Sequence, residues 1–356
     1  MKNKMGRIAA IGAACMLLLC GCGSFDISNT KVVLTTGFDK DEVFRIEEIS
    51  CSIPEIMVYL TNIQKRYEKV YGDEIWRINR NGVMLEDEVK DSVLAKIAQI
   101  KTMNLMAEQM GVTLEEAQEK LVVCAAKEYY ASLDENEIES LGVTAELIEQ
   151  LYREYAIANQ VYQYIIRDVN PEISDDEARI ITIEHILIKT YALDANGQKI
   201  EYLEQDRKEA RELAEQIHEL AVTGEVGFEE LAAQYSEAEN ITYSFGKGVM
   251  EPAFETAAFN LGGGEISDIV TTSYGYHIMK CISTFNKEET DANKVKIVER
   301  KRQEVFSEQY DAFVATLTRD LNEPLWDSVS FLYDEGIDTS NFFEIYDDFF
   351  GDGSDV

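Results

Sequence analysis

Few residues of this 356-residue chain could carry chemistry, and the first candidates are its three histidines. His185 lies inside an apolar run rich in β-branched residues, 180–188, which is typical of a buried strand. His277 lies inside a second apolar run, 274–282. A lone buried histidine is usually a satisfied core residue, so the pair gains weight only from the motifs around it. His218 flanks the apolar face of a predicted helix and is interpreted as structural or exposed.

The cysteines indicate no second kind of site. Beyond residue 22, Cys51, Cys124 and Cys281 remain. They are widely spaced and odd in number, which predicts neither a disulfide framework nor a metal site. Each lies in an apolar pattern and is predicted to be a small core residue.

Further motifs lie between the two histidine strands. Helix patterns over 204–222 and 228–235 precede a glycine-rich stretch, 245–254, which contains Met250 and Phe254. The order of strand, two helices, Gly-x-Met-x-x-x-Phe and Tyr-Gly-Tyr-His-Ile resembles the parvulin family of peptidyl-prolyl cis-trans isomerases. The resemblance covers 179–283 and rests on several separate motifs in one order.

The resemblance implies a role for each candidate residue. Its catalytic pair would be His185 and His277, hydrogen bonded to each other on neighbouring central strands, with Thr272 as the hydroxyl that joins them. Met250 and Phe254 would hold the proline ring of the substrate.

Prolyl isomerisation requires neither a nucleophile, a metal nor a cofactor. An X-Pro bond rotates over a barrier of about 18–20 kcal/mol and takes tens to hundreds of seconds unaided. A catalyst must hold the proline and favour the twisted amide over both planar forms. The twisted amide is less polar at its carbonyl, so an apolar pocket with fixed hydrogen-bond partners suits it. The implied partners are unfolded polypeptides that contain X-Pro bonds.

The sequence departs from the family pattern beside the predicted pocket. Many members place Cys or Asp after the second helix, where this chain has Ala238, and the segment 236–248 is shorter than usual. High activity is therefore not implied, although the fold is. Either Glu237 or Glu239 would substitute if the loop shifted; the alternative is that both are solvated.

Two further features concern the substrate. Tyr274 and Tyr276 flank His277 and are candidates to shape the floor of the pocket. Lys189 and Lys199 stand among acidic residues rather than in a basic cluster, so specificity for phosphoserine or phosphothreonine is not predicted.

Overall composition limits the classes of partner. The chain has 67 Asp+Glu against 33 Lys+Arg, a formal net charge of −34. Nucleic acid requires a basic surface, so nucleic-acid binding is not expected. The 46% of hydrophobic residues suffices for a substantial core.

The N-terminus has the pattern of a bacterial lipoprotein leader. A basic start and a short apolar run make 1–21 a predicted signal peptide. Cys22 follows a small residue, as a lipobox requires, whereas Cys20 follows Leu19. We therefore expect lipid at Cys22, a tether over 22–30 and a location on the extracytoplasmic face of the cell membrane. The alternative is an ordinary signal peptide that happens to contain cysteines.

The remaining chain divides into predicted modules of an α+β protein. Long amphipathic helices over 31–173 predict a helical, chaperone-like module. A parvulin domain, a small antiparallel sheet flanked by helices, would occupy 174–286. A last helix within 287–322 is predicted to pack back on the N-terminal module, which makes the parvulin domain an insertion. Residues 323–356 are expected to be an acidic, aromatic and partly disordered tail.

Two functions fit this organisation, which resembles the PrsA-like and SurA-like extracytoplasmic foldases. One is a membrane-anchored prolyl isomerase that assists the folding of exported proteins. The other is a holdase whose parvulin domain is a weakly active or inactive peptide-binding scaffold. A third and weaker interpretation is a tethered subunit of an envelope assembly.

Overall fold

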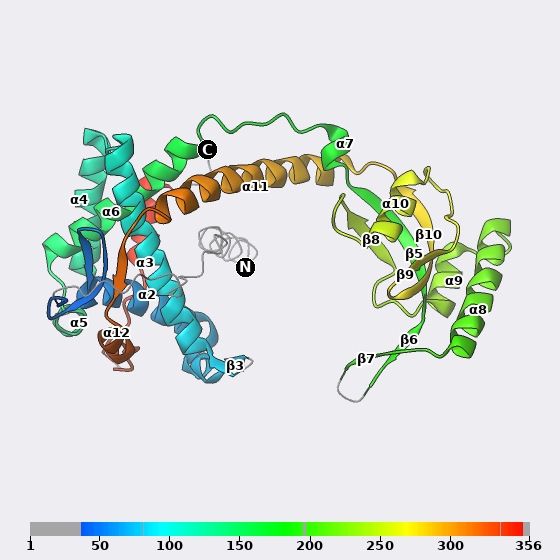
Figure 1. The fold of residues 1–356 in the computed structure, drawn as a ribbon, viewed down its shortest axis with the longest axis horizontal. Coiled ribbons are helices and arrows are strands. Elements are labelled where there is room, and N and C mark those ends of the chain that lie inside the picture. Colours follow the sequence, from blue (N-terminus) through cyan, green and yellow to red (C-terminus); the bar gives the residue numbers. More distant parts are fainter. Residues whose placement is uncertain (1–36, 81, 195–196, 335, 352–356) are drawn as a thin grey trace, which may run out of the picture. The chain divides into compact units, whose positions relative to one another are not determined.

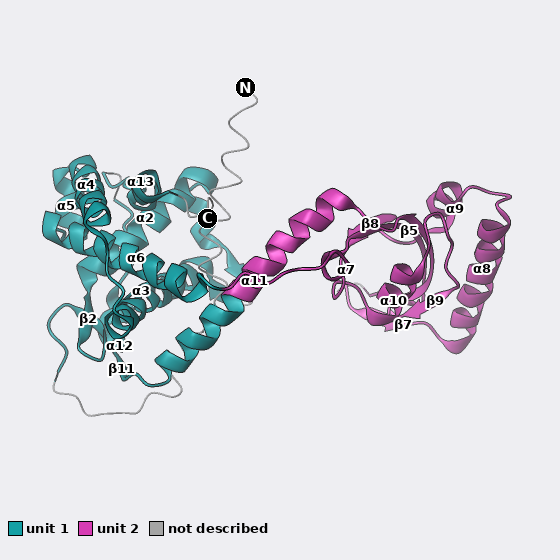
Figure 2. Ribbon diagram, turned by 90° about the horizontal axis from the view of Figure 1, so that it is seen from above, with its two compact units in different colours: residues 1–168, 303–356 teal, residues 169–302 magenta. Residues whose placement is uncertain are grey.

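The computed structural model describes residues 37–351 apart from 81, 195–196 and 335, and they form two compact units (Figure 2). Unit 1 comprises the chain up to residue 168 and from 303 onward, and unit 2 comprises 169–302. Helices and small antiparallel sheets in both units confirm the predicted α+β class. The predicted leader, Cys22 and the tether lie outside the described residues. No helix of the described ranges is both long and apolar enough to cross a membrane.

Unit 2 is built on a four-stranded antiparallel sheet with the strand order β8-β5-β10-β9 (Figure 1). Its two central strands are those that carry the histidines, and each begins one residue later than predicted. The elements of unit 2 before its last helix are α7 (Asp175–Ala178), β5 (Ile181–Lys189), β6 (Tyr191–Leu193), β7 (Lys199–Glu201), α8 (Glu204–Thr223), α9 (Phe228–Tyr235), β8 (Thr242–Phe245), α10 (Pro252–Asn260), β9 (Val270–Thr272) and β10 (Gly275–Ser283).

The two faces of this sheet are buried in separate cores because side chains alternate along a strand. Ile186 and Ile278 face a core shared with α8 and α9. Ile183 and Met279 face the opposite core, which α10 covers with Phe254. Layers of helix, sheet and helix result, and the histidines belong to the face covered by α10.

Unit 1 is a helical bundle with a small three-stranded sheet of order β11-β1-β2. Residues 42–52 form a hairpin, because the chain turns at Glu47, which adopts a positive φ of 50°. The elements of unit 1 are β1 (Glu42–Ile46), β2 (Ile49–Ser52), α2 (Ile53–Tyr71), η2 (Asp73–Arg77), β3 (Asn79–Arg80), β4 (Val83–Met84), α3 (Leu85–Met110), α4 (Glu116–Ser132), α5 (Glu135–Leu141), α6 (Ala145–Ile166), β11 (Arg319–Leu321), α12 (Glu323–Ser328) and α13 (Phe342–Phe350).

The C-terminal segment differs from the expected partly disordered tail over the residues that the structure describes. It forms α12 and α13, and the Phe342 side chain is fully buried. The Phe342 ring stacks on Tyr152 of α6 at a centroid distance of 4.3 Å, and the Tyr152 hydroxyl donates to the Phe342 carbonyl at 2.8 Å. Aromatic residues on one face of α13 fill the bundle, and the acidic residues between them remain on the outside. Residues 352–356 lie outside the description.

The long helix α11 (Lys287–Val314) belongs to both units. It was predicted within 287–322, but it ends before the strand β11. Its residues up to 302 belong to unit 2, where the Thr290 hydroxyl accepts from the Ile180 N–H at 3.0 Å and the Asn293 amide donates to the Ala178 carbonyl at 2.9 Å. Unit 2 therefore continues beyond residue 286, the predicted end of its domain.

Candidate functional site

The two histidines meet on the α10 face of the sheet in unit 2. In the register of β5 and β10, Met279 pairs with His185 and Leu187 pairs with His277, so the histidines are diagonal neighbours. Their rings lie nearly parallel at a centroid distance of 5.5 Å, and both side chains are buried. The period of two along each strand directs both imidazoles to the same face.

A chain of hydrogen bonds determines which nitrogen of each imidazole carries the proton. The Asn240 carbonyl can only accept, so His185 Nε2, at 3.1 Å, must donate to it. Neutral His185 then accepts at Nδ1 from His277 Nδ1–H, at 3.3 Å. His277 Nε2 in turn accepts from the Thr272 hydroxyl at 2.8 Å. With both rings neutral, each hydrogen bond in the chain has one donor and one acceptor.

The surroundings favour that neutral state. Burial lowers the pKa of His185, although its hydrogen bond to Asn240 opposes the shift. Burial, together with the proximity of His185, lowers the pKa of His277 to about 4. Both imidazoles are therefore uncharged at neutral pH, and they lie against the apolar side chains of the core that α10 covers.

Phe254, which was predicted to hold the proline ring, is a core residue. Only 5% of it is exposed, and its ring meets the rings of His277 and His185 edge-on at centroid distances of 5.0 and 5.7 Å. Phe254 and Ala258 lie one turn apart on α10 and both point to the sheet. Met250, which precedes the helix, is partly exposed at the edge of this core. Of the two predicted proline-holding residues, Met250 is therefore the one that remains accessible.

The segment that contains Ala238 is anchored along the end of β5. The Glu237 N–H donates to the Leu187 carbonyl at 2.9 Å, and the Glu237 carboxylate accepts from the Lys189 N–H at 2.6 Å. The N–H and the carboxylate of Glu237 are therefore both hydrogen bonded to the backbone of β5, and Glu237 does not take the place of the missing Cys or Asp. Ala238 is half-buried and contributes no titratable group.

Tyr274 and Tyr276 differ in position although both flank His277. Tyr276 points to the α8 core, because neighbours on a strand face opposite sides, so it does not shape the floor of the site. Tyr274 is 53% exposed and lies 6.5 Å from the Tyr191 ring of the β6–β7 hairpin. The Lys199 ammonium lies 4.4 Å from the centroid of the Tyr191 ring. This hairpin was not predicted, and it forms a rim beside Tyr274.

The turn before β10 depends on a glycine. Gly275 has φ +140°, and a Cβ at this position would lie 2.1 Å from the Ile188 carbonyl oxygen. Only glycine allows the backbone of the turn to approach β5 this closely. The Tyr-Gly-Tyr-His motif thus places Thr272 within reach of His277.

Several polar groups of the site have no local signal in the sequence. The Asn240 carbonyl is a backbone group that any residue could supply. Glu251, Glu255 and Ser273 also make contacts around the site, and only the position of Glu251 directly before Pro252 could have marked it as a helix start.

His218 and the cysteines do not join the site. His218 Nε2 donates to the Ser267 carbonyl at 3.1 Å, which agrees with its structural interpretation. Cys51 and Cys281 are buried as expected, whereas Cys124 is exposed because it lies on the outer side of α4.

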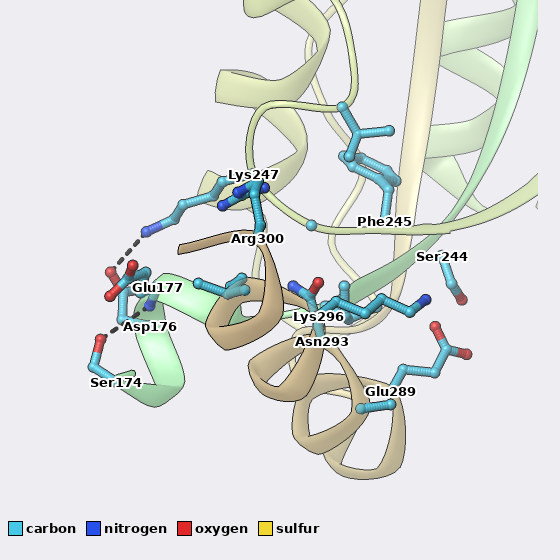
Figure 3. Close-up of a pocket in the computed structure, with 15 residues that line it drawn as sticks. Ser174, Asp176, Glu177, Ser244, Phe245, Lys247, Glu289, Asn293, Lys296 and Arg300 are labelled. Atoms are coloured by element: carbon cyan, nitrogen blue, oxygen red, sulfur yellow. Dashed lines mark hydrogen bonds and ion pairs between the residues drawn. The ribbon is translucent and has the colours of Figure 1, made fainter. Parts of the chain in front are cut away.

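Unit 2 also has a hollow that is separate from the histidine pair (Figure 3). Its walls are α7, the chain from Ser244 to Val249 and the first half of α11. An ion pair between Lys247 and Asp176, at 2.7 Å, spans one end of it. The hollow shares no lining residue with the histidine site and is surrounded by charges of both signs.

Comparison with known proteins gives four findings. Residues 185–283 match the family model of the rotamase, PPIC-type PPIase domain. The chain is 29% identical over 260 residues to the foldase protein PrsA of Caldanaerobacter subterraneus, covering 68% of this chain and 74% of the relative. It is 32% identical over 127 residues to the peptidyl-prolyl cis-trans isomerase pin1 of Schizosaccharomyces pombe, covering 33% of this chain and 73% of the relative. Among solved structures, PrsA from Bacillus cereus matches over 86% of this chain and 98% of its own, at 20% identity and a TM-score of 0.36.

Proposed function

Because the chain belongs to the parvulin, or PPIC-type, family of peptidyl-prolyl cis-trans isomerases, we propose that its histidine site isomerises X-Pro bonds in exported polypeptides. The chain is a parvulin-type isomerase with a foldase relationship to PrsA proteins. The specific substrates, the roles of the residues and the anchor are our proposal.

The observation that carries the proposal is the neutral, fully paired chain from Thr272 through His277 to His185. A charged imidazole would stabilise the planar amide, whose carbonyl oxygen is electron-rich. A neutral pair beneath an apolar wall instead matches the twisted amide, in which resonance is lost and the carbonyl is less polar. Met250 would hold the proline ring, and Phe254 would support the two histidine rings from the side.

Ala238 sets an upper limit on the rate in this scheme. No thiol or carboxylate faces the substrate amide from this position, and Glu237 is bound to the backbone of β5. The remaining contributions are positioning and the pocket itself. We therefore assign the chain a modest isomerase rate.

The foldase role would combine both units. Unit 1 would retain unfolded clients while unit 2 isomerises their prolines. Lipid at Cys22 would hold the protein at the extracytoplasmic face of the bacterial membrane, where clients emerge. The strongly acidic chain, with a net charge of −34, would repel an anionic membrane surface and keep both units away from it.

A second candidate function is a holdase without significant isomerase activity. Ala238 is the observation that favours it. Under this alternative, unit 2 binds proline-containing segments but does not accelerate their isomerisation.

A protease-free isomerisation assay on a prolyl peptide, with the full chain, separates the two functions. The isomerase proposal requires catalysis in the wild type and at least about a tenfold loss in His277→Ala, since one hydrogen-bonded partner is removed. His218→Ala is the matched control and should retain the wild-type rate. Absence of catalysis in the wild type, together with suppression of client aggregation in light scattering, would support the holdase instead.

A further inference from the structure

Two carboxylates at the start of α10, on Glu251 just before the helix and on Glu255 in its first turn, hold two different backbone segments beside the histidine site. Glu255 accepts hydrogen bonds from the N–H groups of the segment before the helix, at 2.7 Å from Gly248, 3.1 Å from Val249 and 3.4 Å from Met250. Glu251 accepts from Ser273, which lies far along the chain in the turn between β9 and β10. The first carboxylate thus holds the segment that carries Met250, and the second holds the turn that carries Thr272.

The contact between Glu251 and Ser273 is a fork. The Ser273 N–H lies 3.1 Å from both carboxylate oxygens, and the Ser273 hydroxyl donates to Oε2 at 2.9 Å. Bonds to an ionised acceptor are stronger than those between neutral groups. The adjacent residue, Thr272, donates to His277 Nε2 at 2.8 Å. Glu251 is therefore connected to the imidazole through Ser273 and Thr272.

Helix capping does not account for this side chain. Glu251 is the residue that precedes the first turn of α10, yet its carboxylate makes no capping hydrogen bond to the helix. Pro252 at the start of the helix already lacks an N–H and has a suitable φ, so α10 does not need a carboxylate there. The side chain of Glu251 is directed to the turn instead.

We propose that Glu251 is a positioning residue that sets the hydrogen bond between Thr272 and His277 and thereby the rate of prolyl isomerisation. The inferred effect of Glu251 on the isomerisation rate rests on the proposed function. Its inferred effect on the hydrogen bond between Thr272 and His277 does not. Three other contacts limit how far the turn can move: Lys199 donates to the Ser273 carbonyl, the Tyr274 N–H donates to Thr272, and the backbone of Gly275 lies against Ile188. Glu251 acts on the remaining freedom, the approach of the Thr272 hydroxyl to the ring.

The test uses Glu251→Ala in the full chain, with Glu255→Ala, four residues further along, as the matched control. Imidazole nitrogen signals in NMR are readable because the chain has three histidines. Glu251→Ala should shift the His277 Nε2 signal, leave His218 unchanged, and lower kcat roughly tenfold with little change in KM, as expected when a positioning contact is lost. Glu255→Ala should instead raise KM, because it releases the segment with Met250, and leave the His277 signal in place.

Two further variants keep the inference testable. Glu251→Gln retains one acceptor oxygen and should recover part of kcat. Ser273→Ala retains the N–H contact on an exposed turn and should give a smaller His277 shift in the same direction, even if Glu251→Ala does not fold. An unchanged His277 signal in both Glu251→Ala and Ser273→Ala would overturn the inference. If the wild type lacks isomerase activity but Glu251→Ala still shifts the His277 signal, the positioning contact is upheld and the proposed function is refuted.

Discussion

Protonation of His277 should destabilise unit 2 as the pH falls. The pKa of this imidazole is about 4 in the folded chain, against an ordinary value of about 6.5. Because the unfolded chain binds the proton more readily, the folded state is most favoured above pH 6.5 and loses stability as the pH falls toward 4. From these two values, the loss between pH 7 and pH 5 is about 2 kcal/mol for this residue alone.

The chain contains its own reporters for this experiment. All three histidines lie in unit 2, whereas both tryptophans, Trp76 and Trp326, lie in unit 1. In urea unfolding, the histidine NMR signals therefore monitor the unfolding of unit 2, and tryptophan fluorescence monitors the unfolding of unit 1. Separate reporters are needed because a protein of two units need not unfold in one step.

His277→Asn removes the titrating group, so the matched comparison is with the wild type at both pH values. Between pH 7 and pH 5, the free energy of unfolding of unit 2 should fall by about 2 kcal/mol less in the variant than in the wild type. The free energy of unfolding of unit 1, followed by tryptophan fluorescence, should change by the same amount in both proteins. In the wild type, isomerase activity should hold down to pH 5 and fall near pH 4, where His277 can no longer accept from Thr272. A native-state titration of His277 near 6.5, or equal pH dependence in variant and wild type, would refute the reasoning.

Four further outcomes follow from the structure. Phe254→Ala should cost about 3–5 kcal/mol in unit 2 unfolding monitored by histidine NMR, because a buried ring is removed from beside both histidines; a fully stable variant with weakened peptide binding would show that Phe254 lines an open site instead. Gly275→Ala should abolish isomerase activity and lower the thermal stability of unit 2, since its Cβ would meet the Ile188 carbonyl at 2.1 Å; wild-type melting would argue against this close approach. Cys22→Ala should move the protein from the membrane to the soluble fraction, and retention of the acyl label would contradict the anchor. Deletion of 169–302 with a flexible linker should leave a helical unit 1 that unfolds cooperatively in circular dichroism, and an unfolded product would mean that unit 1 depends on unit 2.

The sequence predicted the part of the fold that local patterns encode. Both histidine strands and helices α8 and α9 lie within a residue of their expected ranges, because β-branched runs and helical periodicity are local signals. The relation of the two histidines depends on strand register. Once β5 and β10 are neighbours, a period of two brings both imidazoles to one face.

Other features of the site depend on contacts between distant residues and have no local signal. Glu251 and Ser273 are 22 residues apart, and nothing in either neighbourhood marks the pair. The acceptor of His185 is the Asn240 backbone carbonyl, whose position depends on how the chain leaves α9. The C-terminal aromatics were interpreted as a tail because acids separate them, although Phe342 and Tyr346 are one turn apart and form a buried face.

The helix α11 shows why an apolar stripe alone does not decide where a helix packs. Its apolar residues were taken as evidence that the whole helix lies on the N-terminal module. In its second half this holds, since Phe306 is buried in the core of unit 1 and meets the Tyr162 ring at 5.1 Å. In its first half Val295 of the stripe is 62% exposed, and the helix is held in unit 2 through Thr290 and Asn293, which bond to backbone groups that precede β5. Buried polar groups must find partners, so these two side chains bind the helix to unit 2 as specifically as an apolar face would.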